Sequence, residues 1–125
     1  MNLWQQCEGV GLGDSDSKEN IELFLKRNPK MSFIVEKDNE LIGIILGGHD
    51  GRRGYIHHLA VLPSHRRQGV GRLLVEACLN SLKENGILKC HIFMFNNNDN
   101  GKRFWESTGW TYRTDISLFS KFIKN

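Results

Sequence analysis

The chain has 125 residues, of which 39% are hydrophobic and 25% are charged. This composition is typical of one globular domain spanning residues 1–125, and it excludes a fibrous or disordered chain. Three widely spaced cysteines do not suit a disulfide framework, and no apolar run reaches membrane-spanning length. The start of the chain lacks the charged-then-apolar pattern of a signal peptide. We therefore expect a cytoplasmic protein with no membrane partner.

The first part of the chain predicts two helices. Residues 3–7 carry apolar side chains at helical spacing. Asp16 and Glu19 form a capping pair for a second helix, which ends before Pro29. The apolar side chains of that second helix are Ile21, Phe24 and Leu25.

Three antiparallel strands are expected next. Segments 32–36 and 41–46 are rich in apolar residues and are joined by the polar turn 37–40, which predicts a hairpin. The dipeptide Asp50-Gly51 favours a second hairpin turn. It leads into a third strand over residues 55–61.

The segment 59–74 predicts a strand, a short basic turn and a helix. Gly69 and Gly71 let backbone N–H groups crowd around an anion, and the helix start adds unpaired N–H groups and the positive end of its dipole. Lysines and arginines number 17 against 14 acidic residues. Basic side chains gather around this turn, namely Arg52, Arg53, His65, Arg66, Arg67 and Arg72. This pattern predicts a site for pyrophosphate or a phosphorylated cofactor.

The helix after the turn is expected to run over residues 73–82 and to end near Gly86, a residue suited to the position after a helix. Segment 88–95 is apolar on both faces. A strand with two apolar faces is typical of the centre of a sheet, so we expect a central strand there.

The last part of the chain predicts a helix and two strands. The polar loop 96–100 can cap a helix that carries Phe104 and Trp105. Segments 110–113 and 116–123 then have the alternation of strands.

Two motifs in order resemble the signatures of a known family. Residues 66–71 read Arg-Arg-Gln-Gly-Val-Gly, and residues 98–110 read Asn-Asp-Asn-Gly-Lys-Arg-Phe-Trp-Glu-Ser-Thr-Gly-Trp. They are similar to Gln/Arg-x-x-Gly-x-Gly/Ala and Asn-x-x-Ala-x-x-Phe-Tyr-x-x-x-Gly-Phe of the GCN5-related N-acetyltransferases, the GNAT family. The resemblance extends from about Phe33 to the C-terminus. The hairpin over residues 47–54 resembles that of a bacterial subgroup of unknown acceptor.

The resemblance implies an α+β fold. It has a mostly antiparallel sheet of about six strands with helices on both faces, and the fourth- and fifth-strand equivalents splay apart. The family's first strand is expected to be missing, so a partner chain in a homodimer could complete that edge. Two residues depart from the family pattern: Gly101 replaces alanine, and Trp105 replaces a tyrosine proposed to protonate the leaving thiolate.

The resemblance also implies transfer of an acetyl group from acetyl-CoA to a primary amine of a small molecule or peptide, by direct attack and without a metal. The backbone of Leu59, Ala60 and Val61 would pair with the pantetheine arm like an extra strand. Amides of residues 68–72 would hold the pyrophosphate, and Asn98 would bond the arm. The residues assigned to the cofactor are Leu59, Ala60, Val61, Arg66, Arg67, Gln68, Gly69, Val70, Gly71, Arg72 and Asn98.

Acetyl transfer to an amine needs a base, and histidine suits this role because its ordinary pKa lies near neutrality. Strand alternation places Tyr55 and His57 on one face with Leu59 and Val61, and His58 on the other face. We therefore expect His57 to be the base. His58 as base, or a structural role for His57, are alternatives, and the acid would be Tyr55 or water.

Other interpretations stay open. The tryptophan at position 105 suits an acyl-CoA-binding sensor that has lost catalysis. A protein N-terminus or a lysine side chain is an alternative acceptor. Five histidines suggest a metal site, although their spacing does not match common metal-ligand motifs. The arginines would suit a nucleic acid, although the aromatic residues occupy core positions rather than alternating with the arginines. We expect acetyl-CoA and an amine as partners, with no metal and no nucleic acid.

Overall fold

The computed structural model describes residues 18–66, 68–95 and 97–123. The chain forms two compact units, Met1–Phe95 and Asn96–Asn125, and the single domain expected over 1–125 stays a prediction. The helix predicted over residues 3–7, the capping residue Asp16 and the basic residue Arg67 lie outside the described residues. Among the helices described, none is both long enough and apolar enough to cross a membrane.

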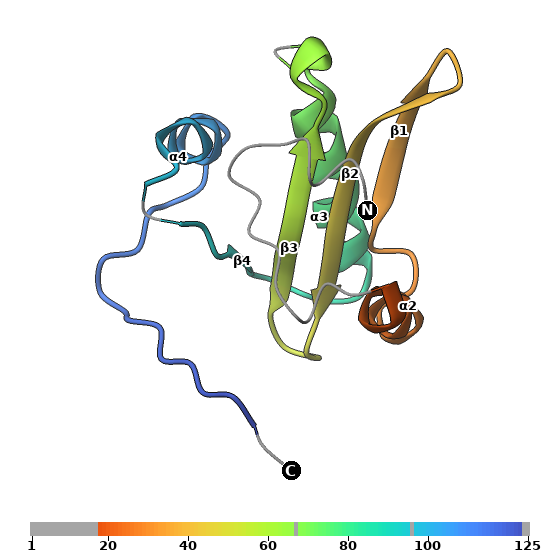
Figure 1. Ribbon diagram of the computed structural model, residues 1–125. Helices are drawn as coiled ribbons and strands as arrows, with labels where there is room; N and C mark the ends of the chain where they lie inside the picture. The colour runs from red at the N-terminus through yellow and green to blue at the C-terminus, as the bar shows by residue number, and fades with distance from the viewer. Residues whose placement is uncertain (1–17, 67, 96, 124–125) are drawn as a thin grey trace. The chain divides into compact units, whose positions relative to one another are not determined.

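The first unit is built on a four-stranded sheet with the order β1-β2-β3-β4 (Figure 1). The first three strands are antiparallel, and β4 runs parallel to β3. In the part of this unit that the structure describes, two α-helices and a short 3-10 turn, η2, accompany the sheet. Its elements are α2 (Lys18–Arg27), β1 (Phe33–Lys37), β2 (Glu40–His49), β3 (Gly54–Val61), η2 (Pro63–His65), α3 (Val70–Glu84) and β4 (Cys90–Ile92).

Both predicted hairpins are confirmed, and local turn chemistry explains them. Asp38 and Asn39 between β1 and β2 have φ angles of 52° and 64°, in the left-handed region that such short turns require. Between β2 and β3, the Asp50 carboxylate accepts hydrogen bonds from the backbone N–H groups of Arg52 (2.8 Å) and Arg53 (2.9 Å). These bonds, with that of Arg53 the stronger influence, lower the pKa of Asp50 below its ordinary value.

A β-bulge in β3 changes which side chains share a face. The pairing with β2 passes from Leu46–His58 to Gly47–Ile56, so His57 has no Cα partner in β2. Such a bulge inserts one residue and breaks the alternation of a regular strand. The contacts of each residue, rather than strand alternation, therefore show which face of the sheet its side chain occupies.

The side chains of Tyr55 and His57 face α2. Tyr55 pairs with Gly48, and a Cβ at Gly48 would meet the ring of Phe24 in α2. The ring centroids of His57 and Phe24 are 5.1 Å apart. His58 pairs with a core residue beneath the same helix. Since paired residues share a face of the sheet, the prediction that His58 points to the opposite face was wrong.

Leu59 and Val61 face α3 instead. Val61 pairs with Gly43, and a Cβ at Gly43 would meet side chains of α3. Leu59 lies two residues earlier on the same strand and shares that face. The predicted common face of these two residues with Tyr55 and His57 was therefore wrong, because the extra residue of the bulge reverses the alternation.

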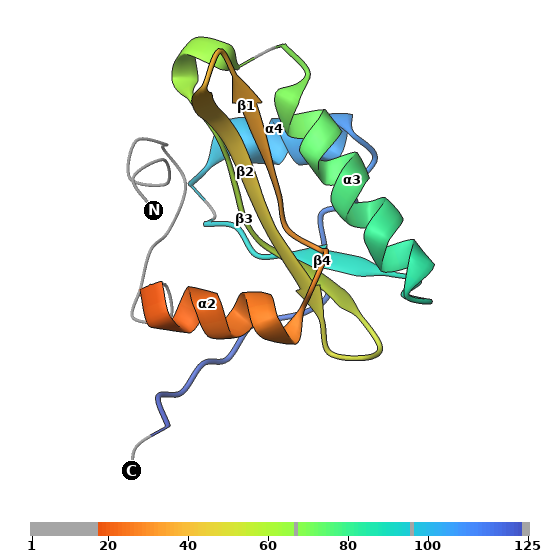
Figure 2. The same ribbon diagram turned by 90° about the vertical axis from the view of Figure 1, so that its right-hand side faces the viewer.

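The helices α2 and α3 cover opposite faces of the sheet, as expected (Figure 2). The core beneath α2 has Leu46 and Ala60 at its centre. The helix α3 approaches β2 closely, because a Cβ at Gly47 would collide with Cys78 and would lie 2.8 Å from the carbonyl oxygen of Met31. Among the described residues, the largest fully buried side chains are Ile45, Ile56, Leu74, Leu82 and Cys78.

Asn28 fixes the end of α2 to the sheet. Its side chain is buried, its amide donates to the carbonyl oxygen of Phe24 (3.3 Å), and its oxygen accepts from the backbone N–H of His49 in β2 (3.0 Å). Because a buried polar group needs partners, these bonds hold α2 at one position over the sheet.

The strand predicted over residues 88–95 is shorter than expected and lies at the edge of the sheet. Only Cys90–Ile92 pair, and they pair with β3 on one side. Leu88, Phe93 and Phe95 are exposed. The prediction of a central strand was wrong because an apolar run shows what a segment can bury, and not how many neighbours pair with it.

The second unit contains the predicted helix but not the predicted strands. The helix α4 (Asp99–Ser107) begins at Asn98, whose side chain accepts from the backbone N–H of Gly101 (3.0 Å). The segments 110–113 and 116–123 have no regular secondary structure among the described residues. Alternating side chains predict a strand, but a strand also needs a partner for its backbone groups. The described sheet therefore has four strands, and not about six.

Candidate active site

The N-terminus of α3 has the geometry of an anion site. Gly69 precedes the helix with a φ of 81° and an exposed backbone, and no described side chain caps the helix there. A Cβ at Gly69 would meet nothing within 4 Å. The neighbouring Gln68 and Arg72 are also exposed, and the first turn carries no acidic residue. The first N–H groups of a helix attract anions in this arrangement.

The strands β3 and β4 pair over a short length only. The parallel ladder joins Gly54 to Cys90, Tyr55 to His91 and Ile56 to Ile92. Beyond Ile56, β3 continues to Val61 as part of the β2 ladder. The two strands therefore separate at the bulge, in agreement with the splay that the family resemblance implies for this pair of strands.

The backbone groups of Leu59 and Val61 point to the side of β3 away from β2. The N–H of Leu62 donates to the carbonyl oxygen of Ile42 (2.8 Å), which makes this pair hydrogen-bonded across the antiparallel ladder. In such a ladder the bonding alternates from residue to residue. Leu59 and Val61 therefore present N–H and C=O groups at the β4 side, and Ala60 directs its own toward β2.

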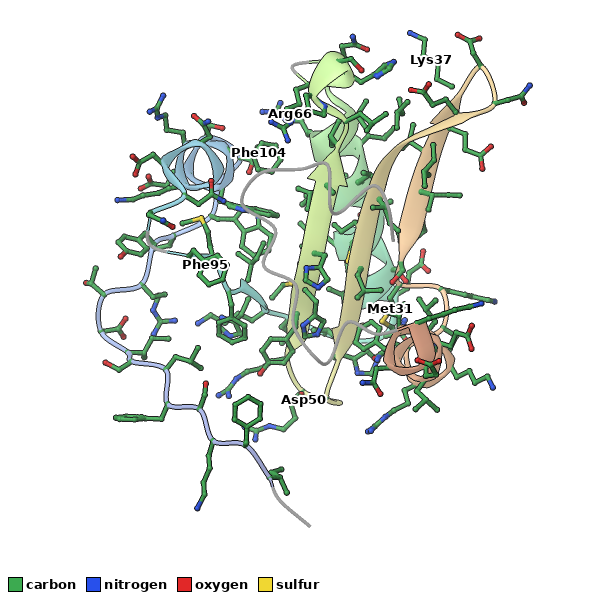
Figure 3. The ribbon with its side chains drawn as sticks, viewed as in Figure 1. Met31, Lys37, Asp50, Arg66, Phe95 and Phe104 are labelled. Atoms are coloured by element: carbon green, nitrogen blue, oxygen red, sulfur yellow. The ribbon has the colours of Figure 1, made fainter. Side chains whose placement is uncertain are left out.

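Arg66 lies in the chain between β3 and α3, and its side chain bonds to this edge. Its Nε donates to the carbonyl oxygen of Val61 (3.2 Å). Figure 3 places Arg66 at the end of β3 that is far from the Asp50 turn. The side chain is exposed, and this bond holds its cation at the edge of β3.

Aromatic and imidazole rings gather where β3 and β4 separate. The Tyr55 ring lies 6.1 Å from His57, 5.9 Å from His91 and 6.1 Å from Phe93, measured between ring centroids. The sequence indicated Tyr55 and His57 as site residues, but not His91. The sequence gives little indication of His91, because its pairing with Tyr55 depends on the register of two strands that are far apart in the chain.

The described residues contain no group of three or more histidine, cysteine or acidic side chains that could hold a metal ion. Burial raises the pKa of the Cys78 thiol to about 12, with a smaller contribution from Cys90, and burial raises that of Cys90 to about 11. Both thiols are therefore protonated near neutral pH and are poor nucleophiles.

The sequence matches the model of the acetyltransferase (GNAT) family over residues 1–110. The chain belongs to the GNAT family. An acetyltransferase of Pectobacterium atrosepticum is 29% identical over 125 residues, which are 100% of this chain and 88% of that protein. An acetyltransferase of Sodalis glossinidius is 26% identical over 121 residues, or 97% of this chain and 84% of that protein.

Solved GNAT structures share the fold. An aminoglycoside 6'-N-acetyltransferase from Acinetobacter haemolyticus has a TM-score of 0.75 at 18% identity, covering 98% of this chain and 90% of that one. A second aminoglycoside N-acetyltransferase, bound to a bisubstrate analogue that contains CoA, has a TM-score of 0.77 at 20% identity and covers 98% and 88%. This GNAT protein is an acetyl-CoA-dependent N-acetyltransferase.

Two residues of the second GNAT signature have structural roles within their own unit. The Asn98 oxygen caps α4, as the sequence predicts, and its role as a cofactor ligand stays a prediction. Trp105 is buried and packs edge-to-face on Phe104 and Trp110, each with a centroid distance of 5.0 Å. An indole N–H is too weak an acid to protonate a thiolate, so Trp105 does not replace the tyrosine as a proton donor. Its role in the structure is to pack in the core of its own unit.

Proposed function

We propose that the protein transfers the acetyl group of acetyl-CoA to a primary amine of a small molecule or peptide. One observation carries the proposal: an uncapped helix N-terminus and a strand edge follow each other on the continuous segment 59–72. An extended ligand with a pyrophosphate at one end and a thioester arm at the other matches both features.

In this proposal the cofactor lies along that segment. The backbone groups of Leu59 and Val61 pair with the pantetheine arm, with Ala60 as the spacer between them. The amides of residues 68–72 hold the pyrophosphate, and its charge is balanced by the arginines of the same segment, Arg66, Arg67 and Arg72. Asn98 is the proposed further ligand of the arm.

The reaction starts with a neutral amine. An alkylamine has a pKa of ~10.4, so keeping it neutral at pH 7 costs about 4–5 kcal/mol. The nitrogen lone pair attacks the thioester carbonyl carbon, and a base takes the amine proton. His57 is the proposed base, because the bulge places it on β3 directly after the ladder with β4 ends.

The second half of the reaction breaks the C–S bond and releases the CoA thiolate. A thiolate is a good leaving group near neutral pH, so water or Tyr55 suffices as the proton donor. A backbone N–H near Val61 is the proposed donor to the carbonyl oxygen, whose negative charge grows during the attack.

Release of free CoA in the presence of amines tests the proposal. The panel contains simple primary amines, an aminoglycoside and a peptide with a free N-terminus and a lysine. We expect release that depends on the amine. The His57→Ala variant should lower kcat about a hundredfold or more while leaving acetyl-CoA affinity unchanged.

The matched control is His58→Ala, which removes the neighbouring imidazole on the same face of the sheet. It should change kcat little. The reverse result would assign the base to His58. Retained acetyl-CoA binding with no CoA release for any amine would instead indicate a binding module, which is the second candidate function because Trp105 replaces the family's tyrosine.

A further inference from the structure

We propose that the acceptor amine carries an aromatic ring and that this ring binds on an aromatic platform made of Phe24, Tyr55, His57, His91 and Phe93. This inference rests on the proposed function, because it assigns the acceptor's place at the same site. Three observations carry it: the geometry of the rings, their position relative to the strand separation, and their charge.

The rings form an extended surface rather than a closed stack. Tyr55 is inclined by 27° to His57 and by 21° to Phe93, at centroid distances of 6.1 Å in both cases. Nearly parallel rings at this separation are offset, so neither ring of a pair covers the whole face of the other. An added ring can contact such faces in an offset arrangement, which is the favourable one for aromatic pairs.

The platform is accessible at its two ends. The Phe93 side chain is 57% exposed, and His57 is also exposed. Phe93 directly follows β4, and its exposed ring leaves apolar surface that a ligand can cover. A ligand ring in contact with Phe93 would therefore gain the free energy of burying this surface.

The platform surrounds the point at which the strands separate. Tyr55 and His91 are paired in the ladder between β3 and β4. The last pair of that ladder is Ile56–Ile92, and it is followed by His57 in β3 and by Phe93 after β4. Phe24 contacts His57 edge-to-face at an interplanar angle of 87°. A ring that binds on this platform beside His57 therefore keeps a short alkylamine within reach of the proposed base and of the β3 edge.

The charge of the platform selects among amines. None of its five side chains carries a carboxylate, so it offers no ion pair to a second or third ammonium group of a polyamine. Its π faces favour one flat apolar group and one cation. An aromatic monoamine satisfies both, whereas these five side chains provide no ion-pair partner for the extra charges of a polycation.

Calorimetry on the protein loaded with CoA measures acceptor binding without reaction. The probes are 2-phenylethylamine, n-butylamine and spermidine, which compare an aromatic monoamine, an aliphatic monoamine and a polycation. We expect 2-phenylethylamine to bind about tenfold more tightly than n-butylamine, as ring contacts of this kind allow. Equal or tighter binding of n-butylamine or spermidine, or no binding of 2-phenylethylamine, would overturn the inference.

Paired variants locate the binding surface. Phe93→Ala should remove most of the preference for 2-phenylethylamine. Phe95→Ala is the control, because Phe95 is similarly exposed, at 61%, and has no described ring contact with the platform. An equal loss in both variants would mean that any exposed apolar side chain binds the probe, and would contradict a specific platform.

The two proposals fail in different ways. If CoA is released with simple amines but without preference for aromatic ones, the platform is wrong and the acetyltransfer proposal stands. If 2-phenylethylamine binds through Phe93 but no amine releases CoA, the platform stands and the proposal of acetyl transfer fails.

Discussion

Gly69 and Gly86 flank the same helix in the same backbone conformation. Their φ angles are 81° and 78°, in the left-handed region, and a Cβ at either would meet nothing within 4 Å. Alanine at either position therefore brings the same conformational strain, on the order of 1 kcal/mol, without a steric clash. The two positions differ in function, because only Gly69 lies at the proposed pyrophosphate site.

This symmetry gives a matched test of the cofactor site. We expect Gly69→Ala and Gly86→Ala to lower the free energy of unfolding by similar amounts. Only Gly69→Ala should weaken acetyl-CoA binding, because its methyl group stands where an anion approaches the first amides of α3. Thermal melts and calorimetric titration measure the two effects. Equal acetyl-CoA affinity in both variants would contradict the assignment.

At the scale of single residues, the sequence predicted the end of a helix better than the direction of side chains on a strand. Gly86 was expected directly after the helix, where a left-handed conformation favours glycine, whereas Gly69 was selected as part of an anion site. The relation of His57 to His58 was not predictable. The bulge that turns both toward α2 depends on the pairing of β3 with β2, and strand alternation assumes a regular ladder.

Among the elements, α2 depends on a polar contact as well as on its apolar face. None of its residues is fully buried, and Asn28 bonds its last turn to β2. We expect Asn28→Ala to lower the free energy of unfolding by about 1–3 kcal/mol, since the backbone N–H of His49 loses its acceptor in a part-buried position. Urea denaturation measures this. Lys26→Ala, at an exposed position of the same helix, should change stability by less than about 0.5 kcal/mol.

The elements that sequence analysis predicted correctly are those with local signals. The first hairpin follows from Asp38 and Asn39, whose side chains suit left-handed turn positions. The helix α3 follows from its apolar period and its terminal glycines. The strands expected over 110–113 and 116–123 and the central position of β4 were wrong, because strand formation depends on partners that side-chain alternation does not specify.

For the whole molecule, the net charge of +3 is a weak guide to the ligand. A basic cluster attracts any phosphate, whether it belongs to a nucleotide cofactor or to a nucleic acid. The N-terminus of α3 distinguishes these ligands better than the net charge does, because a single set of backbone amides accommodates one compact pyrophosphate. A stability measurement can separate these ligands, because a ligand that binds the folded state alone stabilises it according to its affinity.

At one hundred times its dissociation constant, acetyl-CoA should stabilise the protein by about 2.7 kcal/mol and raise Tm by several degrees. Acetyl-pantetheine, which keeps the thioester arm but lacks the pyrophosphate, should have little effect at the same concentration, because the amides of α3 then have no anion to bind. A single-stranded oligonucleotide at equal phosphate concentration should leave Tm unchanged. Stabilisation by the oligonucleotide as large as that by acetyl-CoA would indicate a general phosphate surface. Equal stabilisation by acetyl-pantetheine would mean that binding depends on the β3 edge rather than on the helix.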